Sequence, residues 1–395
     1  MTSTEKLPGL PAPSAEALAL SARLQQQMAA EIGTSGGWIS FARYMELALH
    51  APGLGYYSAG SRKFGAAGDF VTAPEISPLF GRALARQVAS LIPQGLPDIV
   101  EIGAGSGALA QTLLAELAVL DCLPERYLIL ETSGDLRQRQ QQRLEQMDPK
   151  IAGRIEWLDA LPDSITGVII GNEVLDAIPA HRIRITGAAI QELGAGMSGD
   201  DLVWSSRPAS GELAAAAAKL DLPDDYETEL NPAAQALIRD LGLRLVRGVM
   251  LFIDYGFPAH EYYHPQRNRG TLMCHYRHHA HEDPFLWPGL QDITTHVDFS
   301  AIDDAGHGAG LDLLGYTNQA RFLINCGIID LLAEVPATDT ARYAPLAAQV
   351  QQLMSPAEMG ELFKVIALGR SVSSPLLGFY NGDKSASLHQ NRVTL

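Results

Sequence analysis

The chain alternates between short apolar runs and longer segments in which apolar residues recur every three or four positions. The short runs are residues 98–102, 127–130, 155–158, 167–170 and 249–253, and the helical patterns at 107–119 and 136–147 lie between the first three of them. Such runs predict buried strands, and the longer patterns predict amphipathic helices. Their alternation predicts an α/β fold with a parallel sheet, whose ligand binds beyond the carboxyl ends of the strands.

Further elements are predicted on both sides of these strands. Helical patterns at 15–32, 41–49 and 78–91 precede them, with Ser40 and Ser77 as N-caps. Between the last two strands, residues 181–204 predict antiparallel strands and residues 212–241 predict broken helices. The segment 256–297 is too long for a simple connection, which indicates a functional role. Residues 311–315, 318–326, 341–353 and 363–368 then complete the sheet and its helices.

Composition and charge narrow the classes of partner. With 47% hydrophobic and 19% charged residues, the 395-residue chain is typical of a globular protein. The 29 basic and 45 acidic side chains give a net charge of −16, which opposes nucleic-acid binding. The sequence contains neither a membrane-spanning run nor a secretory signal pattern, so we expect no membrane insertion and a cytoplasmic location. The scattered Cys122, Cys274 and Cys326 suggest neither disulfides nor a zinc site.

A glycine-rich loop follows the first predicted strand. Gly103, Gly105 and Gly107 let the backbone approach a ligand closely, and the next helix begins where an anionic group is stabilised. With Ala108, the same spacing also fits a dinucleotide loop, so the loop alone leaves NAD and S-adenosylmethionine open.

Three acidic residues favour S-adenosylmethionine. Glu101 lies where a carboxylate can approach the ammonium of the methionine moiety. Glu131 ends the second strand and can accept from both ribose hydroxyls, a role that NAD shares. Asp159 follows the third strand and is placed to accept from an adenine amino group. We therefore expect S-adenosylmethionine as the cofactor.

The fourth strand leads into Asn172, Glu173 and Asp176 on the expected acceptor side. Methyl transfer is an in-line displacement from an activated sulfonium, so the protein must chiefly align the acceptor and tune its charge. Paired carboxylates suit a guanidinium, which they can bind in a bidentate manner. In the alternative interpretation, Asp176 caps a helix and Glu173 is solvated.

Several segments together carry a family resemblance. They are Gly55-Tyr56-Tyr57, Phe64-Gly65, residues 68–77, residues 101–107, residues 172–179, Asp254-Tyr255-Gly256, Pro288-Gly289, residues 292–294, residues 296–299 and residues 359–365. The chain resembles, over roughly residues 38–370, the class I methyltransferases that include the mitochondrial complex I assembly arginine methyltransferase and its bacterial MidA-like relatives.

This resemblance implies a Rossmann-like, mostly parallel seven-stranded sheet with helices on both faces, an N-terminal helical segment and inserted substrate-side elements. It implies S-adenosylmethionine as donor, an arginine-containing segment of a protein as acceptor, and a link to complex I assembly. Residues implied for the cofactor pocket are Gly68, Asp69, Thr72, Gly103 and Gly105; those implied for the acceptor are Tyr57, Asn172, Glu173 and Asp176. Where relatives often have Thr-Leu-Arg, this chain has Thr271-Leu272-Met273, which removes a positive charge near the acceptor side.

We expect the following division of the chain. Residues 1–92 form a helical segment over the cofactor site, residues 93–180 and 243–375 form the methyltransferase core, and residues 181–242 form an insertion. Within the core, residues 256–310 form an acceptor-side loop region, and residues 376–395 form a tail.

Two other functions remain open. An NAD-linked oxidoreductase would use the same glycine loop and needs an acid or base for hydride transfer. His181 and His296 are candidates for that role, on residue type alone. A non-catalytic assembly factor would bind S-adenosylmethionine without turnover. The histidines between 275 and 296 invite a metal hypothesis, but their spacing matches no standard zinc motif and we expect no metal.

Overall fold

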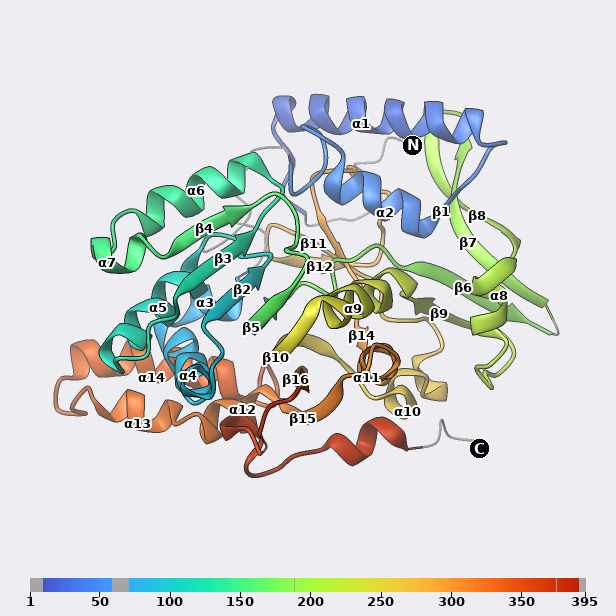
Figure 1. The fold of residues 1–395 in the computed structure, drawn as a ribbon. Helices are drawn as coiled ribbons and strands as arrows, with labels where there is room; N and C mark the ends of the chain where they lie inside the picture. Colours follow the sequence, from blue (N-terminus) through green and yellow to red (C-terminus); the bar gives the residue numbers. More distant parts are fainter. Residues whose placement is uncertain (1–9, 59–70, 188, 374, 391–395) are drawn as a thin grey trace.

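The computed structural model describes residues 10–58, 71–187, 189–373 and 375–390. Its main sheet has eight strands (Figure 1). Along the sheet they are β15 (Asp312–Asn318), β16 (Phe363–Arg370), β10 (Leu245–Phe257), β5 (Ile165–Asn172), β2 (Asp98–Ile102), β3 (Arg126–Leu130) and β4 (Ile155–Leu158), with the short β14 (Val297–Asp298) also paired to β10. The five strands from β10 to β4 are parallel, and β16 is antiparallel to both of its neighbours. The fold is therefore α/β with a mixed sheet, as expected, but the sheet has eight paired strands where seven were expected, because residues 297–298 add to β10.

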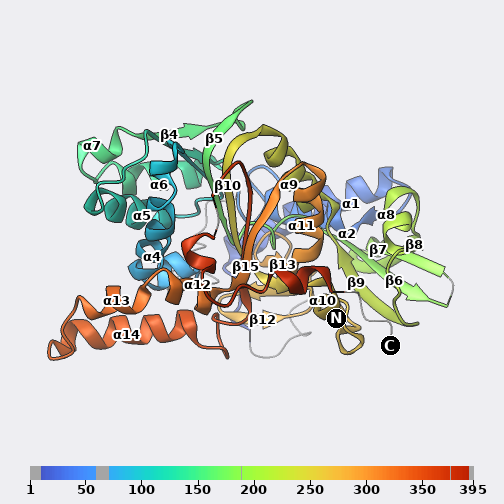
Figure 2. The same cartoon turned by 60° about the horizontal axis from the view of Figure 1, so that its bottom comes forward.

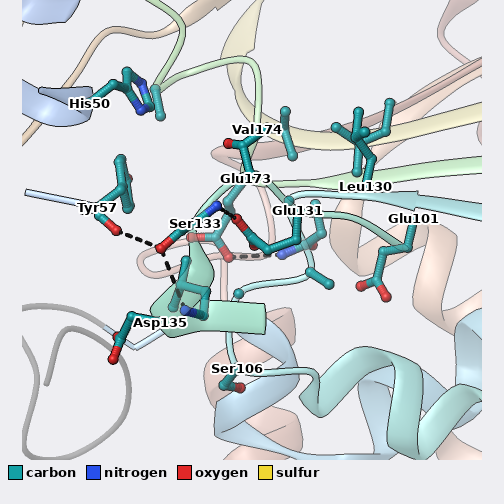
Figure 3. A pocket seen from close by; sticks show the side chains of 18 of the residues that line it. His50, Tyr57, Glu101, Ser106, Leu130, Glu131, Ser133, Asp135, Glu173 and Val174 are labelled. Carbon is teal, nitrogen blue, oxygen red and sulfur yellow. Dashed lines mark hydrogen bonds between the residues drawn. The ribbon is translucent and has the colours of Figure 1, made fainter. Parts of the chain in front are cut away.

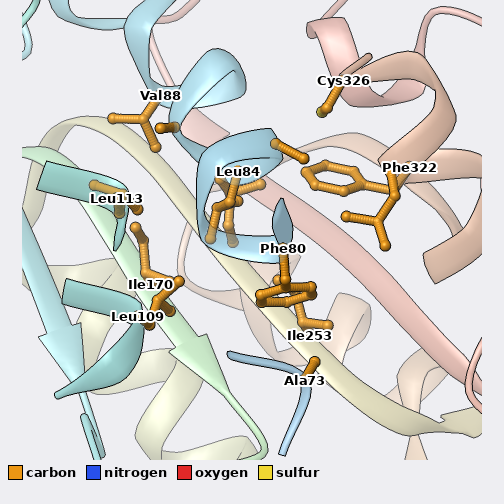
Figure 4. Packing of buried hydrophobic residues seen from close by; sticks show 14 of the residues in the cluster. Ala73, Phe80, Leu84, Val88, Leu109, Leu113, Ile170, Ile253, Phe322 and Cys326 are labelled. Carbon is orange, nitrogen blue, oxygen red and sulfur yellow. The ribbon is translucent and has the colours of Figure 1, made fainter. Parts of the chain in front are cut away.

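Helices cover both faces of this sheet because alternate strand residues point to opposite sides. On one face, Ile99 of β2 packs with α4 (Pro78–Ala89), α5 (Ala108–Val119) and α12 (Gln319–Asn325). On the other face, Val100 packs with α9 (Pro232–Arg244) and α11 (Phe299–Gly308). Figure 4 shows the first cluster, where Phe80 and Leu84 of α4 lie between α5, the sheet and α12.

The remaining helices lie outside these two layers, and residues 211–217 pack away from the main sheet. Figure 2 shows α13 (Ile328–Ala333) and α14 (Thr340–Met354) together beside α4 and α12. The others are α6 (Gly134–Leu144), α7 (Pro149–Ala152), α8 (Gly211–Ala217) and α10 (Ala259–Tyr262).

A second sheet of five strands extends the core. It contains β1 (Ile39–Ser40), β7 (Ala189–Ser198), β6 (His181–Thr186) and β9 (Tyr226–Leu230), with β8 (Asp201–Pro208) paired to β7. The antiparallel strands predicted within residues 181–204 are present. The prediction of only helices at 212–241 was wrong at β9, whose Glu227 pairs with Arg182 and Arg184 of β6.

Two N-terminal helices pack on the second sheet, and a third, short helix packs on α4 and α5. These are α1 (Ala15–Thr34), α2 (Phe41–His50) and the short α3 (Ala73–Ile76), and Figure 1 shows α1 and α2 above the ends of β2 and β5. A third sheet lies near α2 and contains β11 (Met273–Tyr276), β12 (His279–His281) and β13 (Asp292–Thr294). It carries most of the histidine-rich segment and places Asp292 under the N-terminal helices.

The segment after β16 does not extend away from the core up to residue 390. Leu376, Phe379 and Leu388 are buried, and the Ser300 hydroxyl donates to the Leu388 carbonyl at 2.7 Å. This part of the segment that we expected as a tail therefore packs as part of the core. Within the described ranges, no helix is both long enough and apolar enough to cross a membrane.

Candidate active site

A cavity of about 670 Å³ lies at the carboxyl ends of β2, β3 and β5. Its lining includes Thr72, Glu101, Gly103, Gly105 and Glu131, and also Tyr57, Asn172 and Glu173. Figure 3 shows Tyr57 and His50 across this cavity from Glu101, with Glu131 and Ser133 between them. The structure thus brings residues from the N-terminal helices, the glycine loop and three strands to one site.

The glycine loop needs a backbone that only glycine adopts easily. Gly103, Gly105 and Gly107 have φ values of 66°, 54° and 81°, in the left-handed region that a Cβ disfavours. A Cβ on Gly103 would also lie 3.0 Å from Val174. Gly107 does not line the cavity; it precedes α5 as the N-cap residue and lies against Gln140. Its role is therefore to shape the loop.

Glu131 is held in place by neighbours on both oxygens. Its Oε1 accepts from the Ser133 backbone N–H at 2.8 Å, and its Oε2 accepts from Gln140 Nε2 at 3.0 Å. The same amide nitrogen donates to the Gly105 carbonyl at 3.0 Å. Gln140 thus ties the end of β3 to the glycine loop, and Glu131 presents a fixed carboxylate to the cavity.

Glu101 is a buried acid that contacts Tyr127. The Tyr127 hydroxyl donates to its Oε2 at 2.8 Å. Burial raises the pKa of Glu101 to about 7, and the nearby charge of Glu131 adds to the shift. A buried carboxylate is stabilised by an ammonium or another cation beside it, so this position suits a cationic part of a ligand.

The segment 72–77 packs on the glycine loop through a polar contact. The Ser106 hydroxyl donates to the Glu75 carboxylate, and Arg143 Nη1 donates to Ser106 Oγ at 2.8 Å and to Glu75 Oε1 at 3.1 Å. Thr72 lines the cavity next to this contact. Gly68 and Asp69 lie outside the described residues.

Glu173 sits in a strained backbone conformation. Its φ is 53°, which costs of order 1–3 kcal/mol for a residue with a side chain. Its backbone N–H donates to the Ile253 carbonyl at 2.8 Å, and its Oε1 accepts from the Ala73 N–H at 3.3 Å and from Asn172 Nδ2 at 3.2 Å. Burial, and then the charge of Asp176, raises the pKa of Glu173 to about 8.

Asp254 at the end of β10 holds the turn after Glu173. Its Oδ2 accepts from the backbone N–H groups of Val174 at 3.0 Å, Leu175 at 2.8 Å and Asp176 at 3.3 Å. These contacts fix the turn that places Glu173 at the cavity and Asp176 behind it.

Asp176 is buried and does not line the cavity. The Tyr255 hydroxyl donates to its Oδ2, whereas its Oδ1 has no hydrogen-bond partner among the described residues. Burial raises the pKa of Asp176 to about 6, and the Tyr255 hydrogen bond opposes the shift.

Tyr57 approaches the same region from the N-terminal side. Its hydroxyl donates to Asp292 Oδ1 at 2.9 Å, and its carbonyl accepts from Ser133 Oγ at 3.1 Å. Burial, together with the charges of Asp292 and Asp176, raises the pKa of Tyr57 well above its usual value. Tyr57 is therefore a neutral donor that joins the 292 segment to the cavity.

Asp159 was expected at the adenine position, but the structure places it elsewhere. Its side chain is 89% exposed, pairs with Arg137 and does not line the cavity. The reason is that β4 ends at Leu158, and the chain then turns outward. Ser133 and Asp135 at the start of α6 line this part of the cavity instead.

Some site residues were not recognised from the sequence. Tyr127 and Gln140 contact Glu101 and Glu131, but each lies in an ordinary strand or helix pattern that carries no signal of its contact. Tyr255, which contacts Asp176, belongs to a segment of the family resemblance but was given no role. Asp292 appeared within the segment 292–294 of the family resemblance, and its contact with Tyr57 could not be expected because the two residues are 235 positions apart. Ser133 caps α6, and this N-cap pattern is a signal in the sequence that could have marked the edge of the cavity.

The two histidines considered as acid or base of an oxidoreductase, His181 and His296, lie apart from the glycine loop. His296 packs edge-on against the Tyr255 ring at 5.2 Å, and burial lowers its pKa to about 4. His181 contacts Glu192 in the second sheet. Among the described residues, no group of three or more His, Cys, Asp or Glu side chains could hold a metal ion.

Comparison with known proteins decides the family. Residues 79–317 match a family model described as "Putative S-adenosyl-L-methionine-dependent methyltransferase". The chain belongs to this family. Its match spans the glycine loop, the segment 172–176 and the turn at Asp254. S-adenosylmethionine is therefore the methyl donor, which resolves the choice that the glycine loop left open against NAD, and the chain is an enzyme of this class.

Similar proteins cover nearly the whole chain. A crystal structure of a Burkholderia thailandensis protein bound to S-adenosyl-homocysteine is 52% identical, covers 96% of this chain and 100% of its own, and has a TM-score of 0.93. The Protein arginine methyltransferase NDUFAF7, mitochondrial, of Rattus norvegicus is 30% identical over 85% of this chain and 81% of its own. Its Caenorhabditis elegans homologue is 28% identical over 84% and 83%.

These relatives contradict the expected cytoplasmic location, because the animal proteins are named as mitochondrial. The expectation failed because it rested on the lack of a secretory signal and of a spanning segment. Neither of these features identifies a compartment.

The residues at the cavity fit S-adenosylmethionine on three observations. Gly103 and Gly105 line the cavity without a side chain, Glu131 lines it with a fixed carboxylate, and Glu101 is a buried acid suited to a cation. When bound, this cofactor supplies an electrophilic methyl group on a sulfonium.

Proposed function

We propose that this methyltransferase acts on an arginine side chain of a protein. The supporting observation is that Asn172 Oδ1 and Asp176 Oδ1 are both buried acceptors without a hydrogen-bond partner in the described part of the chain. An unsatisfied buried acceptor costs about 1–3 kcal/mol. A guanidinium offers five N–H donors in a planar array and a positive charge, so it matches these acceptors and the adjacent Glu173.

In this proposal, the residues at the acceptor site have different roles. Glu173 binds the guanidinium at the cavity, and Asp176, buried behind it, adds the negative charge that draws the positive charge away from the nitrogen that is methylated, while Asn172 and Tyr57 orient the group. Tyr255 fixes the Asp176 carboxylate through its hydrogen bond. Methylation would form an N–C bond while the S–C bond of the donor breaks and a thioether leaves, and the nitrogen must then lose a proton. Glu173 accepts this proton, since a pKa of about 8 makes its carboxylate an effective base around neutral pH.

On the cofactor side, we propose Gly68, Asp69, Thr72, Glu101, Gly103, Gly105 and Glu131 as binding residues, with Gly107 shaping the loop. Glu101 pairs with the ammonium and Glu131 accepts from the ribose hydroxyls. The parallel strands with β16 and β15 then form the seven-stranded methyltransferase sheet, and the division of the chain follows the segments given above, except that residues 376–390 pack against the core. The position of Asp159 does not support its proposed contact with adenine.

Relatives support the choice of arginine. The rat and nematode proteins are named as protein arginine methyltransferases and align over more than four fifths of this chain. The family resemblance extends the proposal to a role in assembly of respiratory complex I, with an arginine-containing segment of a partner protein as the acceptor.

The experiment that tests the proposal is methyl transfer from radiolabelled S-adenosylmethionine into a lysate that lacks the enzyme, followed by acid hydrolysis and separation of methylated amino acids. We expect label in methylarginine and in a small number of proteins. Label in methyllysine or only in small molecules would reject arginine as the acceptor, and calorimetric binding without any labelled product would favour a non-catalytic assembly role.

A further inference from the structure

A second cavity of about 720 Å³ lies between α1, the turn that joins β7 to β8, and residues 282–287. Figure 1 shows the ends of β7 and β8 beside α1, and Gln25 of α1 donates to the Asp200 carbonyl at 2.7 Å. We refer to this cavity as the α1 groove. The mechanism proposed above uses none of its lining residues.

The α1 groove is acidic along its rim. Four carboxylates line it, from Asp200, Asp201, Glu282 and Asp283. Within the described ranges, none of the four takes part in an ion pair. A recess lined by charges of one sign attracts the opposite charge. This groove therefore favours a cationic ligand.

Apolar and aromatic side chains line the same groove. Leu18 is 41% exposed and Trp204 is 39% exposed. Trp204 packs on Phe285 with the ring centroids 4.9 Å apart, and Phe285 packs on Tyr44 at the same distance. Because these rings are fixed by their neighbours, they offer a rigid apolar surface beside the carboxylates, which suits aliphatic side chains and the stems of Lys and Arg.

We infer that the α1 groove binds a basic, partly apolar segment of the protein that this enzyme methylates. A metal ion is a poor alternative, since no group of three acidic, His or Cys side chains converges in the described part of the chain. A second copy of the chain is also a poor occupant, because each copy carries a net charge of −16. The pairing of carboxylates with exposed aromatic surface selects a cationic peptide.

The groove is connected to the active site through one continuous segment. Gln291 Nε2 donates to the carbonyls of Asp283 at 3.1 Å and Pro284 at 2.8 Å, and the next residue, Asp292, accepts from Tyr57. Nine positions separate Asp283 from Asp292, which limits their distance to about 30 Å. A substrate segment of about ten extended residues can therefore occupy the groove and place an arginine at the acceptor site. This inference rests on the proposed function.

The test is a binding measurement that does not require methyl transfer. A fluorescein-labelled peptide of four Gly-Lys-Leu repeats is titrated with the full chain in low salt, and its anisotropy is followed without cofactor. We expect saturable binding that weakens in high salt, because exposed charge pairs are screened. A peptide of four Gly-Glu-Leu repeats has the same apolar content and is expected not to bind.

The double variant Asp201→Lys with Glu282→Lys reverses two exposed rim charges and should weaken peptide binding at least tenfold. A matched control, Asp304→Lys with Glu358→Lys, makes the same change in net charge away from the groove and should change affinity less than threefold. Glu173→Gln should also leave affinity within threefold, which separates the groove from the acceptor site. If the charge-reversed protein fails to fold, Asp200→Asn with Glu282→Gln replaces it, with a loss of at least threefold expected.

Three results would overturn the inference: equal binding of the two peptides, no binding of the lysine peptide, or equal affinity of the groove variant and its control. Concentration-dependent dimerisation that is lost in the groove variant would also overturn it, in favour of a second copy as occupant. The peptide contains no arginine, so groove binding can succeed or fail independently of arginine methylation.

Discussion

Replacing Glu173 by Gln tests the acceptor site most informatively. The amide keeps the size of the side chain, and its Oε1 can still accept from the Ala73 N–H and from Asn172. What is lost is one negative charge beside the bound guanidinium. Truncating one partner of a buried charge pair costs about 2–5 kcal/mol. Taking about 3 kcal/mol, we expect kcat/KM for the protein substrate to fall roughly a hundredfold.

The same variant should also change how the free energy of unfolding depends on pH. The pKa of Glu173 is about 8 in the folded chain against a usual value of 4.5, so the folded state retains a proton that the unfolded state releases. Folding is therefore progressively disfavoured as pH rises from about 4.5 to about 8. The full pKa shift corresponds to a loss of roughly 5 kcal/mol in the free energy of unfolding at high pH. Because Glu173 faces an open cavity, where solvent screens its charge, we expect a loss of about 2 kcal/mol.

The assays are methyl transfer under steady-state conditions, calorimetric titration with S-adenosylmethionine, and denaturant unfolding at pH 5 and pH 9. Glu173→Gln should bind the cofactor within threefold of the parent chain, lose transfer, and gain stability over the parent at pH 9 but not at pH 5. The exposed Glu358→Gln serves as control and should change none of these. Retained transfer, or a loss of cofactor affinity equal to the loss of transfer, would refute the role assigned to Glu173.

Three further changes have expected outcomes. Gly105→Val should abolish calorimetric binding of S-adenosylmethionine, because φ is 54° and Gly105 lines the cavity, while Gly187→Val, with a similar φ of 57° in an exposed turn, should spare it. Equal affinities in the two variants would contradict this. Asp176→Asn should keep cofactor affinity and lower kcat tenfold or more, and a matched loss of affinity would place Asp176 on the cofactor. The pH profile of kcat/KM should rise through about pH 8 as Glu173 ionises, and a profile flat from pH 6 to 9 would exclude Glu173 as the base.

Much of the fold could be predicted because its strands are buried on both faces. Residues 249–253 form a continuous apolar run, since helices cover both sides of the sheet. Strand β9 gave no such signal. Its sequence, Tyr-Glu-Thr-Glu-Leu, alternates charged residues that are buried only because Arg182 and Arg184 of another strand neutralise Glu227.

The site could be predicted where it depends on local sequence and not where it depends on distant contacts. Glu101 and Glu131 follow from their positions at the ends of strands, and both line the cavity. Asp159 has an equivalent position in the sequence, but a turn after Leu158 directs it to solvent, where it pairs with Arg137. The contacts of Tyr57 with Asp292 and of Tyr255 with Asp176 join segments far apart in the chain, so no local pattern could reveal them.

The most direct test of the central claim is methyl transfer from S-adenosylmethionine to protein, measured with the parent chain and with Glu173→Gln in the same lysate. The account predicts that the parent chain forms labelled methylarginine and that the variant binds the cofactor but forms about a hundredfold less product. Label that appears in another amino acid, or that appears equally with both proteins, would contradict it.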